Sequence, residues 1–417
     1  MKKIAIIGSG ISGLTAAHLL HTKHDITLFE SNDYIGGHTA TKDIEYGAKT
    51  YAIDTGFIVC NDKTYPNFLK LMDKIGIKRR PTEMSFSVKN IRNGLEYNGN
   101  NLNSLFAQRR NLLKPSFWRL INEILRFNKQ CKELYSKNQI NPALTLGDFL
   151  VAEKFSQAFC ENYILPMGAA IWSTSLTEMR AFQLRFFVQF FYNHGLLNIS
   201  DRPQWYVIEG GSREYIAPLI AGFKDKIRLN SKILKVSRTD NAVQLHFDDD
   251  LIEQFDEVIF ACHSDQALAL LGDATEDEKT ILGAISYSAN DVVLHTDKTL
   301  LPKRPLAWAS WNYQLDDNLD RPACVTYNMN ILQGITAPTT FCVTLNQTDL
   351  IDPTKILAKF VYHHPVFNQK SLAAQQQRLN ICGQQHTHFV GAYWHNGFHE
   401  DGVKSALCVT ERFGVSL

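Results

Sequence analysis

The chain has 417 residues, of which 45% are hydrophobic and 20% charged, as in an ordinary globular protein with two or three domain-sized units. The formal net charge of +1 argues against a general nucleic-acid binder, so we expect no nucleic-acid partner. No apolar run approaches the length that spans a bilayer, and this pattern predicts that the chain is not an integral membrane protein.

The first thirty residues predict a strand, a glycine turn, a helix and a second strand. Residues 4–7 form a short β-branched run, residues 14–20 have helical spacing, and residues 26–29 are again apolar. The turn between the first strand and the helix reads G-x-G-x-x-G, with glycines at Gly8, Gly10 and Gly13. This arrangement allows a tight turn, brings a pyrophosphate close to the backbone, and lets helix and strand pack closely.

The same segment supplies a phosphate site and a ribose site. The predicted helix begins near Ser9, Ile11 and Ser12, where free N–H groups and the positive dipole end favour phosphate. Glu30 ends the second strand and can accept hydrogen bonds from ribose hydroxyls, and it would repel a 2′-phosphate. The pattern predicts a dinucleotide-binding site, and the alternatives are a glycine loop of another α/β protein and a secretory signal peptide. The central glycines and the acid that closes the strand argue against a signal peptide that is cleaved off.

Two further segments extend the pattern after Ser31. Gly36 and Gly37 follow the acid, and Ala52 to Val59 reads AIDTGFIV, a predicted strand that carries a D-x-G motif at Asp54, Thr55 and Gly56. An acid, a glycine pair and a D-x-G strand together resemble the flavoproteins related to amine oxidases, phytoene desaturases and protoporphyrinogen oxidases. The resemblance implies that these segments cradle the diphosphate and flavin of FAD. His38 stands where arginine is usual in that family.

The C-terminus carries the second strong signal. Phe389 to Trp394 reads as a strand and Val403 to Phe413 as a helix, with Glu400 and Asp401 at its N-terminus. In the family this helix points its N-terminus at the flavin pyrimidine edge, where a positive dipole end stabilises the reduced flavin.

The resemblance implies an α/β fold with a Rossmann-like FAD-binding domain of the glutathione-reductase type, built from residues 1–60, 203–275 and 385–417. Residues 61–202 and 276–384 would form an α+β substrate-binding domain with a helical insertion and a mixed sheet. No cysteine matches the position used for covalent attachment, so the FAD should be non-covalent. The implied cofactor contacts are Gly8, Ser9, Gly10, Ile11, Ser12, Gly13, Glu30, Ser31, Gly36, Gly37, His38, Thr39, Asp54, Thr55, Gly56, Phe57, Gly391, Glu400, Asp401, Gly402 and Val403.

The segment from Gln108 to Lys137 is rich in lysine and arginine, and its apolar residues recur at helical spacing after Pro115. A basic amphipathic helix can lie on an anionic membrane surface. The favoured alternative is a stripe facing the core with a solvated charged face. Peripheral contact with the inner face of the membrane therefore stays open.

Aromatic residues gather in three places. Residues 164–177 are predicted to be a connection that faces a cavity around Trp172, residues 179–192 a helix with Phe186 and Phe190 on one face, and residues 306–313 a strand. Core packing is the plain interpretation, and the wall of an apolar substrate channel is the alternative. The candidate substrate contacts are Trp172, Phe186, Phe190, Trp308, Trp311 and Tyr313.

Several strings, among them IGGHTAT, IEGGSREYI and GAYWHNGFHEDG, resemble the bacterial FAD-binding proteins associated with cyclopropane-fatty-acyl synthases and related methyltransferases. They are also similar to the flavin domain fused to plant cyclopropane synthases. This implies an acyl chain as substrate and a fatty-acyl methyltransferase as functional partner. Asn290 stands where amine oxidases place a lysine near the flavin. His395 is the candidate proton carrier, with Tyr393 and Trp394 beside it as further catalytic candidates.

Three hypotheses therefore compete: an FAD-dependent oxidoreductase that moves a hydride to or from a fatty-acyl chain, an amine oxidase that releases hydrogen peroxide, and a flavin-binding partner of a lipid methyltransferase without turnover. The eight scattered cysteines lack C-x-x-C spacing, and with no signal peptide they predict reduced, mostly buried thiols in a cytoplasmic protein. The histidines lack partners at ligand spacing, so we expect no metal.

Overall fold

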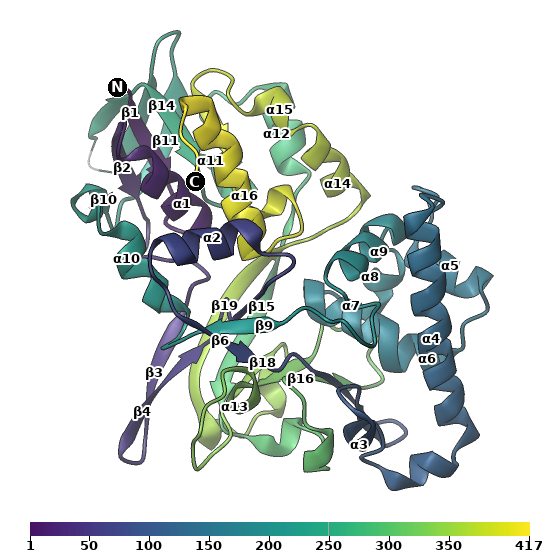
Figure 1. The fold of residues 1–417 in the computed structure, drawn as a ribbon. Helices are drawn as coiled ribbons and strands as arrows, with labels where there is room; N and C mark the ends of the chain where they lie inside the picture. The colour runs from purple at the N-terminus through teal and green to yellow at the C-terminus, as the bar shows by residue number, and fades with distance from the viewer. Residues whose placement is uncertain (249) are drawn as a thin grey trace.

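A parallel sheet built from distant parts of the chain forms one half of the molecule (Figure 1). The computed structural model describes residues 1–248 and 250–417. The strand order is β10 (Ile227–Arg228), β2 (Asp25–Phe29), β1 (Lys3–Ile7), β14 (Glu257–Phe260) and β20 (Thr387–Phe389). Strand β1 lies in the middle and pairs in parallel with β2 and β14, which explains why Ile4 and Ile6 are wholly buried.

A large mixed sheet forms the centre of the other half. Its order is β19 (Ile356–Pro365), β15 (Tyr287–His295), β18 (Cys342–Leu345), β17 (Val325–Asn328), β16 (Trp311–Leu315), β7 (Phe86–Asn90) and β8 (Leu95–Asn98). All neighbours are antiparallel except β16 and β7, whose chain directions coincide. The parallel sheet and this mixed sheet confirm the predicted α/β class with a second α+β half.

Three small sheets complete the strands. They are β11 (Ile233–Arg238), β12 (Val243–Phe247) and β13 (Ile252–Phe255); the hairpin of β3 (Thr41–Tyr46) and β4 (Lys49–Asp54); and β5 (Val59–Asn61), β9 (Trp205–Ile208) and β6 (Arg79–Thr82). The last sheet joins the two halves, because Val207 of β9 packs in the second core and Ile208 in the first.

The helices cover the parallel sheet or form a separate group beside the mixed sheet. The first set is α1 (Ile11–Leu20), α2 (Pro66–Lys74), α10 (Ile216–Ile220), α11 (Ser264–Leu270), α12 (Glu276–Gly283), α14 (Gln369–Gln376), α15 (Arg378–Ile381) and α16 (His399–Thr410). The second set is α4 (Pro115–Ser136), α5 (Leu146–Ala152), α6 (Gln157–Phe159), α7 (Leu165–Trp172), α8 (Leu176–Arg180) and α9 (Leu184–Asn193). Two short helices, α3 (Leu102–Leu105) and α13 (Met329–Leu332), lie against the mixed sheet.

The two hydrophobic cores agree with the predicted domain segments except for three helices. The strands of the parallel sheet come from the segments predicted for the cofactor domain, and those of the mixed sheet from the segments predicted for the substrate domain. Helices α12, α14 and α15 lie in the latter segments, yet Leu282, Ala374 and Ile381 pack in the core of the parallel sheet. The predicted domain boundaries stay a prediction.

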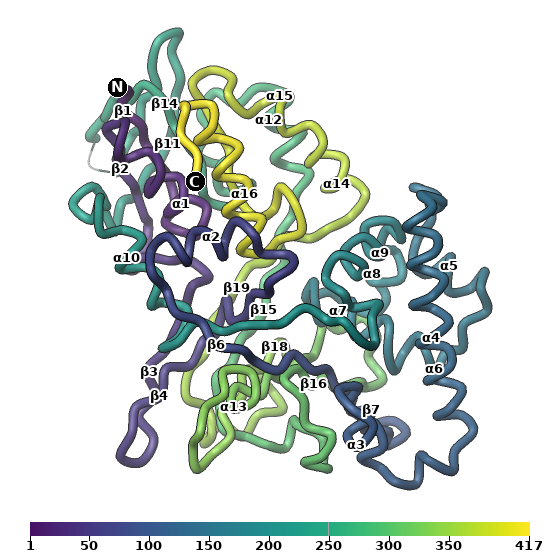
Figure 2. Tube along the Cα trace, in the orientation of Figure 1, coloured from purple at the N-terminus to yellow at the C-terminus, as the bar shows by residue number. Residues whose placement is uncertain are grey.

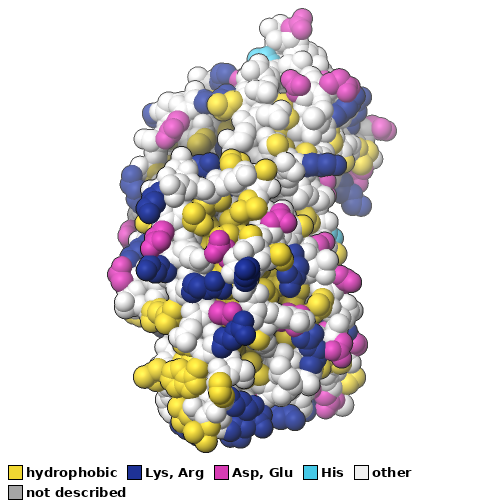
Figure 3. Space-filling model, turned by 90° about the vertical axis from the view of Figure 1, so that its right-hand side faces the viewer, with side chains coloured by type: hydrophobic (Ala, Val, Ile, Leu, Met, Phe, Trp, Pro, Cys, Tyr) yellow, Lys and Arg dark blue, Asp and Glu magenta, His cyan; other side chains and the backbone are white. Residues whose placement is uncertain are grey.

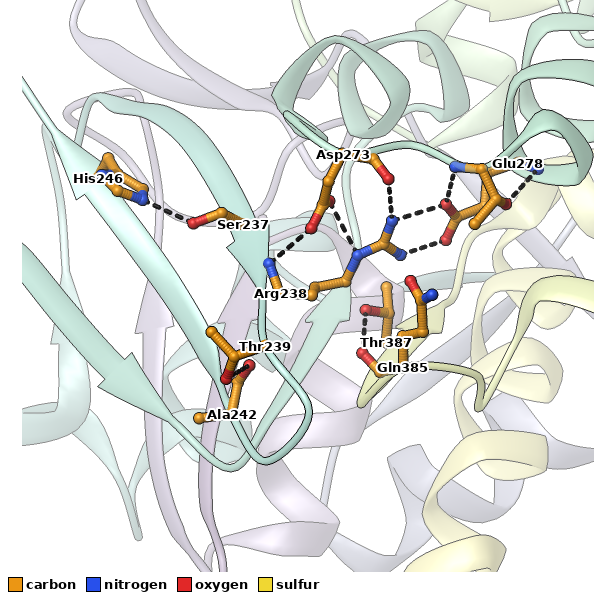
Figure 4. Close-up of polar contacts among 10 residues, drawn as sticks. Ser237, Arg238, Thr239, Ala242, His246, Asp273, Glu278, Gln385 and Thr387 are labelled. Carbon is orange, nitrogen blue, oxygen red and sulfur yellow. Dashed lines mark hydrogen bonds and ion pairs between the residues drawn. The ribbon is translucent and has the colours of Figure 1, made fainter.

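A buried ion cluster fastens β11 to α12 (Figure 4). The Arg238 guanidinium donates to both carboxylate oxygens of Glu278, at 2.5 and 2.9 Å, and also to Asp273. The side chains of Arg238 and Glu278 are each 2% exposed. Because both charges are removed from water, loss of Arg238 would leave the Glu278 carboxylate as an uncompensated buried charge.

Several predicted boundaries are wrong. Residues 165–172 form a helix instead of a connection, because Pro166 opens it and Gly168 lets it approach α8 and α9: a Cβ there would lie 2.7 Å from the Met179 sulfur. The strand predicted for 306–313 begins only at Trp311, since Pro305 starts a 3₁₀ turn. The last strand ends at Phe389 and is followed by a 3₁₀ turn, η9 (Ala392–Trp394), so the last helix begins at His399 and ends at Thr410.

The two ends of the chain meet. In Figure 2 the purple N-terminal segment and the yellow C-terminal segment run beside each other, and α1 and α16 are in extensive contact. Within the described residues, no helix combines the length and apolar character needed to cross a membrane. The eight cysteines are free, and only Cys262 and Cys408 are not buried, as predicted.

Candidate cofactor and substrate site

The glycine turn between β1 and α1 has the close contacts that its sequence predicts. The Gly8 N–H donates to the Phe29 carbonyl at 2.8 Å, and Gly8 has a φ of 110°. A Cβ at Gly13 would lie 2.0 Å from the Gly8 carbonyl oxygen, so only glycine fits there. A Cβ at Gly10 would meet no atom within 4 Å. The turn is therefore tightly packed at both ends and open at its centre.

That opening lies at the start of α1. Gly10 is the N-cap residue and has no side chain to cap the helix, and the first intrahelical bond runs from Leu14 N to Gly10 O. The N–H groups of Ile11 and Ser12 are thus free of intrahelical acceptors and lie beside the open space. An anion can accept both hydrogen bonds there, at the positive end of the helix dipole.

Glu30 directly follows β2 and lies next to this turn. One carboxylate oxygen accepts from the Ser9 N–H at 3.0 Å and the Ser9 hydroxyl at 2.6 Å, and the other accepts from the Asn32 N–H at 3.0 Å. Ser31 is exposed, and its hydroxyl lies 3.3 Å from the Glu30 carboxylate. The acid is therefore at the edge where a ribose would lie, as an acceptor oriented by the turn itself.

The glycine pair packs directly on the turn. The Gly36 N–H donates to the Ser9 carbonyl at 3.1 Å, and a Cβ at Gly37 would lie 3.3 Å from the Gly10 Cα. The D-x-G segment closes on the same loop: Phe57 N donates to the His38 carbonyl at 2.8 Å, and a Cβ at Gly56 would lie 2.1 Å from that oxygen. Three segments that the sequence marked separately thus form one wall.

Asp54 organises this wall from inside. Its carboxylate accepts from the Thr41 hydroxyl at 2.6 Å, from the Ser212 N–H at 2.9 Å, and from the Gln333 amide at 2.9 Å. Burial raises its pKa to about 6. With these bonds made to protein groups, Asp54 ties β4 to the segment that follows β9, while the neighbouring Thr55 bonds to the Ala40 carbonyl at 3.2 Å.

His399 joins four segments at one point. Its Nε2 lies 3.3 Å from the Thr39 hydroxyl and 3.2 Å from the Tyr215 hydroxyl, and its ring stacks on Phe57 with centroids 3.6 Å apart. Burial lowers the pKa of His399 to about 3, so the ring is neutral and fixed by its neighbours. Neither His399 nor Tyr215 was predicted as a site residue, because a single polar side chain outside a recognisable motif gives no indication in the sequence that it will meet distant segments.

The start of α16 packs on the start of α1. A Cβ at Gly402 would lie 2.7 Å from the Ile11 side chain and 2.9 Å from the Ser12 hydroxyl, and Val403 is wholly buried. Gly391 donates its N–H to the Ser405 hydroxyl at 2.6 Å. The predicted cofactor contacts Gly402 and Val403 therefore lie next to the glycine turn.

The two acids at the start of α16 bind protein N–H groups. The Glu400 carboxylate accepts from the backbone of Phe68 at 2.8 Å and from the Asn67 amide at 2.6 Å. Asp401 accepts from Phe398 N at 2.9 Å, and burial raises its pKa to about 7. Both residues fix the helix start, and direct contact with a cofactor stays a prediction for them.

The residues present fit FAD. The open centre at Gly10, the free N–H groups of Ile11 and Ser12, and the acid at Glu30 match a diphosphate and a ribose. His38 adds a buried Nε2 without a protein partner, as expected of a group whose partner is a ligand. These residues would hold the adenosine and diphosphate end, and the start of α16 would face the flavin end.

Beyond His38 the site continues as a group of neutral imidazoles. The His38 ring lies 5.7 Å from His364 and 6.1 Å from His263, and 5.2 Å from the Tyr362 ring. Burial lowers the pKa of His38 to about 3 and that of His364 to about 4, and the neighbouring imidazoles add to both shifts. Within the described chain, no group of three His, Cys, Asp or Glu residues has the arrangement of a metal site.

His364 connects this group to the second half. Its Nδ1 lies 3.0 Å from the Ser173 hydroxyl and 3.4 Å from the Asn290 amide nitrogen. The Asn290 carbonyl oxygen accepts from the Asn346 amide at 2.9 Å, and the Asn290 nitrogen, which lies near His364, donates to the Ser288 carbonyl at 3.2 Å. The contacts with Ser173 and Asn290 therefore fix the orientation of the His364 ring.

An aromatic cluster lies next to Ser173. The Trp172 ring is 4.8 Å from Phe190 and 5.8 Å from Phe186. Phe190 stacks on Phe398 at 5.3 Å, and Phe186 on Phe367 at 5.7 Å. The cluster thus extends from α7 and α9 to the residue that precedes α16, and the Trp172 indole N–H is buried without a partner.

The other candidates lie elsewhere. Trp311 and Tyr313 share one side of β16, while Trp308 precedes the strand and donates its indole N–H to the Pro302 carbonyl at 2.8 Å. Tyr393 and Trp394 are 3% and 2% exposed and pack in the core of the parallel sheet. His395 follows them, with a pKa that burial lowers to about 4. The structure brings together the predicted cofactor residues and three of the six aromatic ones.

The sequence profile described as flavin-containing amine oxidoreductase matches residues 11–339. A fatty acid isomerase from P. acnes that produces CLA has 17% identity and a TM-score of 0.70, with 99% of this chain and 98% of that chain covered. Cyclohexylamine oxidase from Brevibacterium oxydans IH-35A has 16% identity and a TM-score of 0.72, with 99% of each chain covered. Putrescine oxidase bound to putrescine has 13% identity and a TM-score of 0.70, again with 99% of each chain covered.

Proposed function

Since the chain belongs to the flavin-containing amine oxidoreductase family and is an FAD-dependent oxidoreductase, we propose that its substrate is an apolar chain of the fatty-acyl or lipid class. The observation that carries this proposal is the aromatic cluster of Trp172, Phe186, Phe190, Phe367 and Phe398. It joins the helical group to the start of α16, so an acyl chain that lies along it would reach the reactive end of the cofactor site.

The character of this cluster favours a chain over a small cation. Aromatic and apolar side chains gain about 0.8 kcal/mol for each methylene that they remove from water, without a requirement for a charged partner. Asn290, which stands where the related amine oxidases have lysine, is wholly buried and bonded to His364 and Asn346. The name of the structurally similar fatty acid isomerase is consistent with this substrate class.

When bound, FAD supplies the two-electron chemistry, which is exchange of a hydride with a carbon of the chain. The protein has to hold that carbon in place, exclude water, and manage one proton. The aromatic cluster would provide the first two functions, because its rings are packed against each other and are buried or partly buried. The start of α16 provides a positive dipole end for charge that develops at the cofactor.

His364 is our candidate for the proton. It lies between His38 in the cofactor wall and Ser173 beside Trp172, and its ring is neutral because burial lowers its pKa to about 4. Ser173 and Asn290 orient the ring from the other side. A neutral imidazole held in this way can exchange a proton with the chain or with solvent. This assignment replaces His395 as the first candidate, since no contact among the described residues brings His395 to the aromatic cluster.

Anaerobic mixing of the FAD-loaded protein with candidate substrates tests the proposal. Saturated and unsaturated fatty acids and their phospholipid esters are mixed in turn, and flavin absorbance is followed. Loss of absorbance with an acyl chain supports the proposal. Loss only with primary amines, with hydrogen peroxide released in air, would assign the chain to the amine oxidases. No change with any substrate would favour a flavin-binding partner of a fatty-acyl methyltransferase.

A further inference from the structure

We propose that one end of the second half docks on an anionic lipid membrane. The surface is built by α3, by the 3₁₀ turns η1 (Arg109–Leu113) and η6 (Pro305–Ala307), and by the first turn of α4, and it is called the basic apolar face below. It shows at the lower end of Figure 3, where hydrophobic and Lys or Arg side chains gather next to each other.

The apolar part is unusually exposed. Leu113 is 88% exposed and Leu102 is 75% exposed, and Leu112, Trp118 and Leu306 are between 40% and 46% exposed. Single exposed leucines are common on protein surfaces, but a group of them on adjacent turns indicates a site of interaction. A tryptophan at the edge of such a group is typical of the membrane interface, where an apolar ring and a polar N–H are both accommodated.

These residues form one surface. Helix α3, which carries Leu102, packs on η6, which carries Leu306. The Trp118 ring lies 5.3 Å from Phe106, and its indole N–H donates to the Leu112 carbonyl at 2.9 Å. The turn that carries Leu112 and Leu113 is therefore held in place by α4, with both leucine side chains outward.

The charge of the face is strongly one-sided. Residues 97–122 include Arg109, Arg110, Lys114 and Arg119 and contain no Asp or Glu. Residues 298–315 include Lys303 and Arg304 and likewise contain no Asp or Glu. The acids that border the first segment are buried: Glu96 accepts from the backbone of Lys303 and Arg304, at 3.0 and 3.2 Å, and Glu123 from that of Ser156 at 3.1 Å. In a chain with a net charge of +1, this is a local accumulation of positive charge.

Together the two properties select the partner. A nucleic acid would match the charge and leave the protruding leucines in water. An anionic bilayer attracts the arginines and lysines to its headgroups and accepts the leucines below them. The body of α4 takes no part, because Phe117, Leu120, Phe127 and Cys131 face the core.

Co-sedimentation with vesicles tests the proposal on the full-length, FAD-loaded protein. Phosphatidylcholine vesicles with about 30% phosphatidylglycerol are compared with pure phosphatidylcholine, at low and high salt. The apolar variant is Leu112→Ser with Leu113→Ser, and its control is Val151→Ser with Leu379→Ser, at positions 72% and 69% exposed elsewhere. The charge variant is Lys114→Gln with Arg304→Gln, and its control is Lys224→Gln with Lys232→Gln, also exposed.

We expect binding to anionic vesicles that weakens with salt, and little binding to pure phosphatidylcholine. Each basic residue near the surface contributes about fivefold, so the charge variant should bind about 30-fold more weakly. The apolar variant should lose at least about tenfold, and both controls should bind as the wild type does. Absence of wild-type binding, equal binding to neutral vesicles, or equal losses in the controls would overturn the proposal. Binding to a nucleic acid with no vesicle binding would overturn it too.

Discussion

Replacement of Gly10 by valine should remove FAD and leave the fold intact. A Cβ at Gly10 meets no protein atom within 4 Å, and its φ of −67° and ψ of 176° suit any residue. Valine is a poor N-cap residue, which costs no more than about 1 kcal/mol. The new Cβ enters the open space where a ligand at the start of α1 would lie.

The expected loss follows from the hydrogen bonds at that helix start. A diphosphate accepts from the N–H groups of Ile11 and Ser12, and hydrogen bonds to a charged group contribute about 1.5–3 kcal/mol each. Two such bonds correspond to about 3–6 kcal/mol, or a hundredfold to ten-thousandfold in the dissociation constant of FAD. A protein that is yellow when purified should therefore be colourless as the Gly10→Val variant.

Two comparison variants separate binding from folding. Gly99→Val is matched to Gly10→Val, because a Cβ at Gly99 also meets nothing within 4 Å, and it should stay yellow. Gly13→Ala should lose stability as well as colour, since its Cβ would lie 2.0 Å from the Gly8 carbonyl oxygen. Urea unfolding and FAD titration of the apoprotein measure the two effects. A fully loaded, yellow Gly10→Val protein would refute the reasoning.

Three further predictions concern stability and catalysis. Arg238→Met should destabilise the protein by about 3–5 kcal/mol in urea unfolding because it strands the Glu278 carboxylate, whereas the double replacement with Glu278→Leu should cost far less; equal costs would contradict this. Burial lowers the pKa of His295 to about 4, below its value near 6.5 in the unfolded chain, so the neutral ring stabilises the fold above pH 6.5 and this stabilisation is lost as pH falls toward 4. Between pH 7 and about pH 5 the free energy of unfolding of the wild type should therefore fall by about 2 kcal/mol more than that of His295→Gln. Parallel pH profiles of the two proteins would contradict this. His364→Gln should slow anaerobic flavin reduction by about 10²–10⁴-fold with unchanged FAD content, and an unchanged rate would exclude His364 as the proton carrier.

The cofactor wall was predictable because its chemistry is local. The glycines at residues 8–13 lie in one turn between the first strand and the first helix, and Glu30 directly follows the next strand of the same unit. The glycine pair and the D-x-G segment were placed by resemblance, and the structure brings both to the same turn. Local spacing and the motifs shared with the family therefore predicted this part of the fold.

The rest depended on contacts between distant segments. His364 and Ser173 lie 191 positions apart, and His399 meets Thr39 from the other end of the chain. The helix at residues 165–172 was missed because its glycine and alanines read as a loop, whereas they serve close packing on Met179 and Phe187. Burial, which decides the protonation of the histidines, likewise follows from tertiary packing and leaves no trace in local sequence.

The most direct test of the proposed acyl substrate is the chain-length dependence of binding. Dissociation constants of saturated fatty acids, below their aggregation limits, are obtained from the change that each causes in the flavin absorbance of the oxidised protein. If the aromatic cluster of Trp172 and Phe190 holds the chain, each added methylene should tighten binding by about fourfold until the cluster is filled. Affinity that does not change with chain length, with primary amines perturbing the flavin instead, would contradict the account.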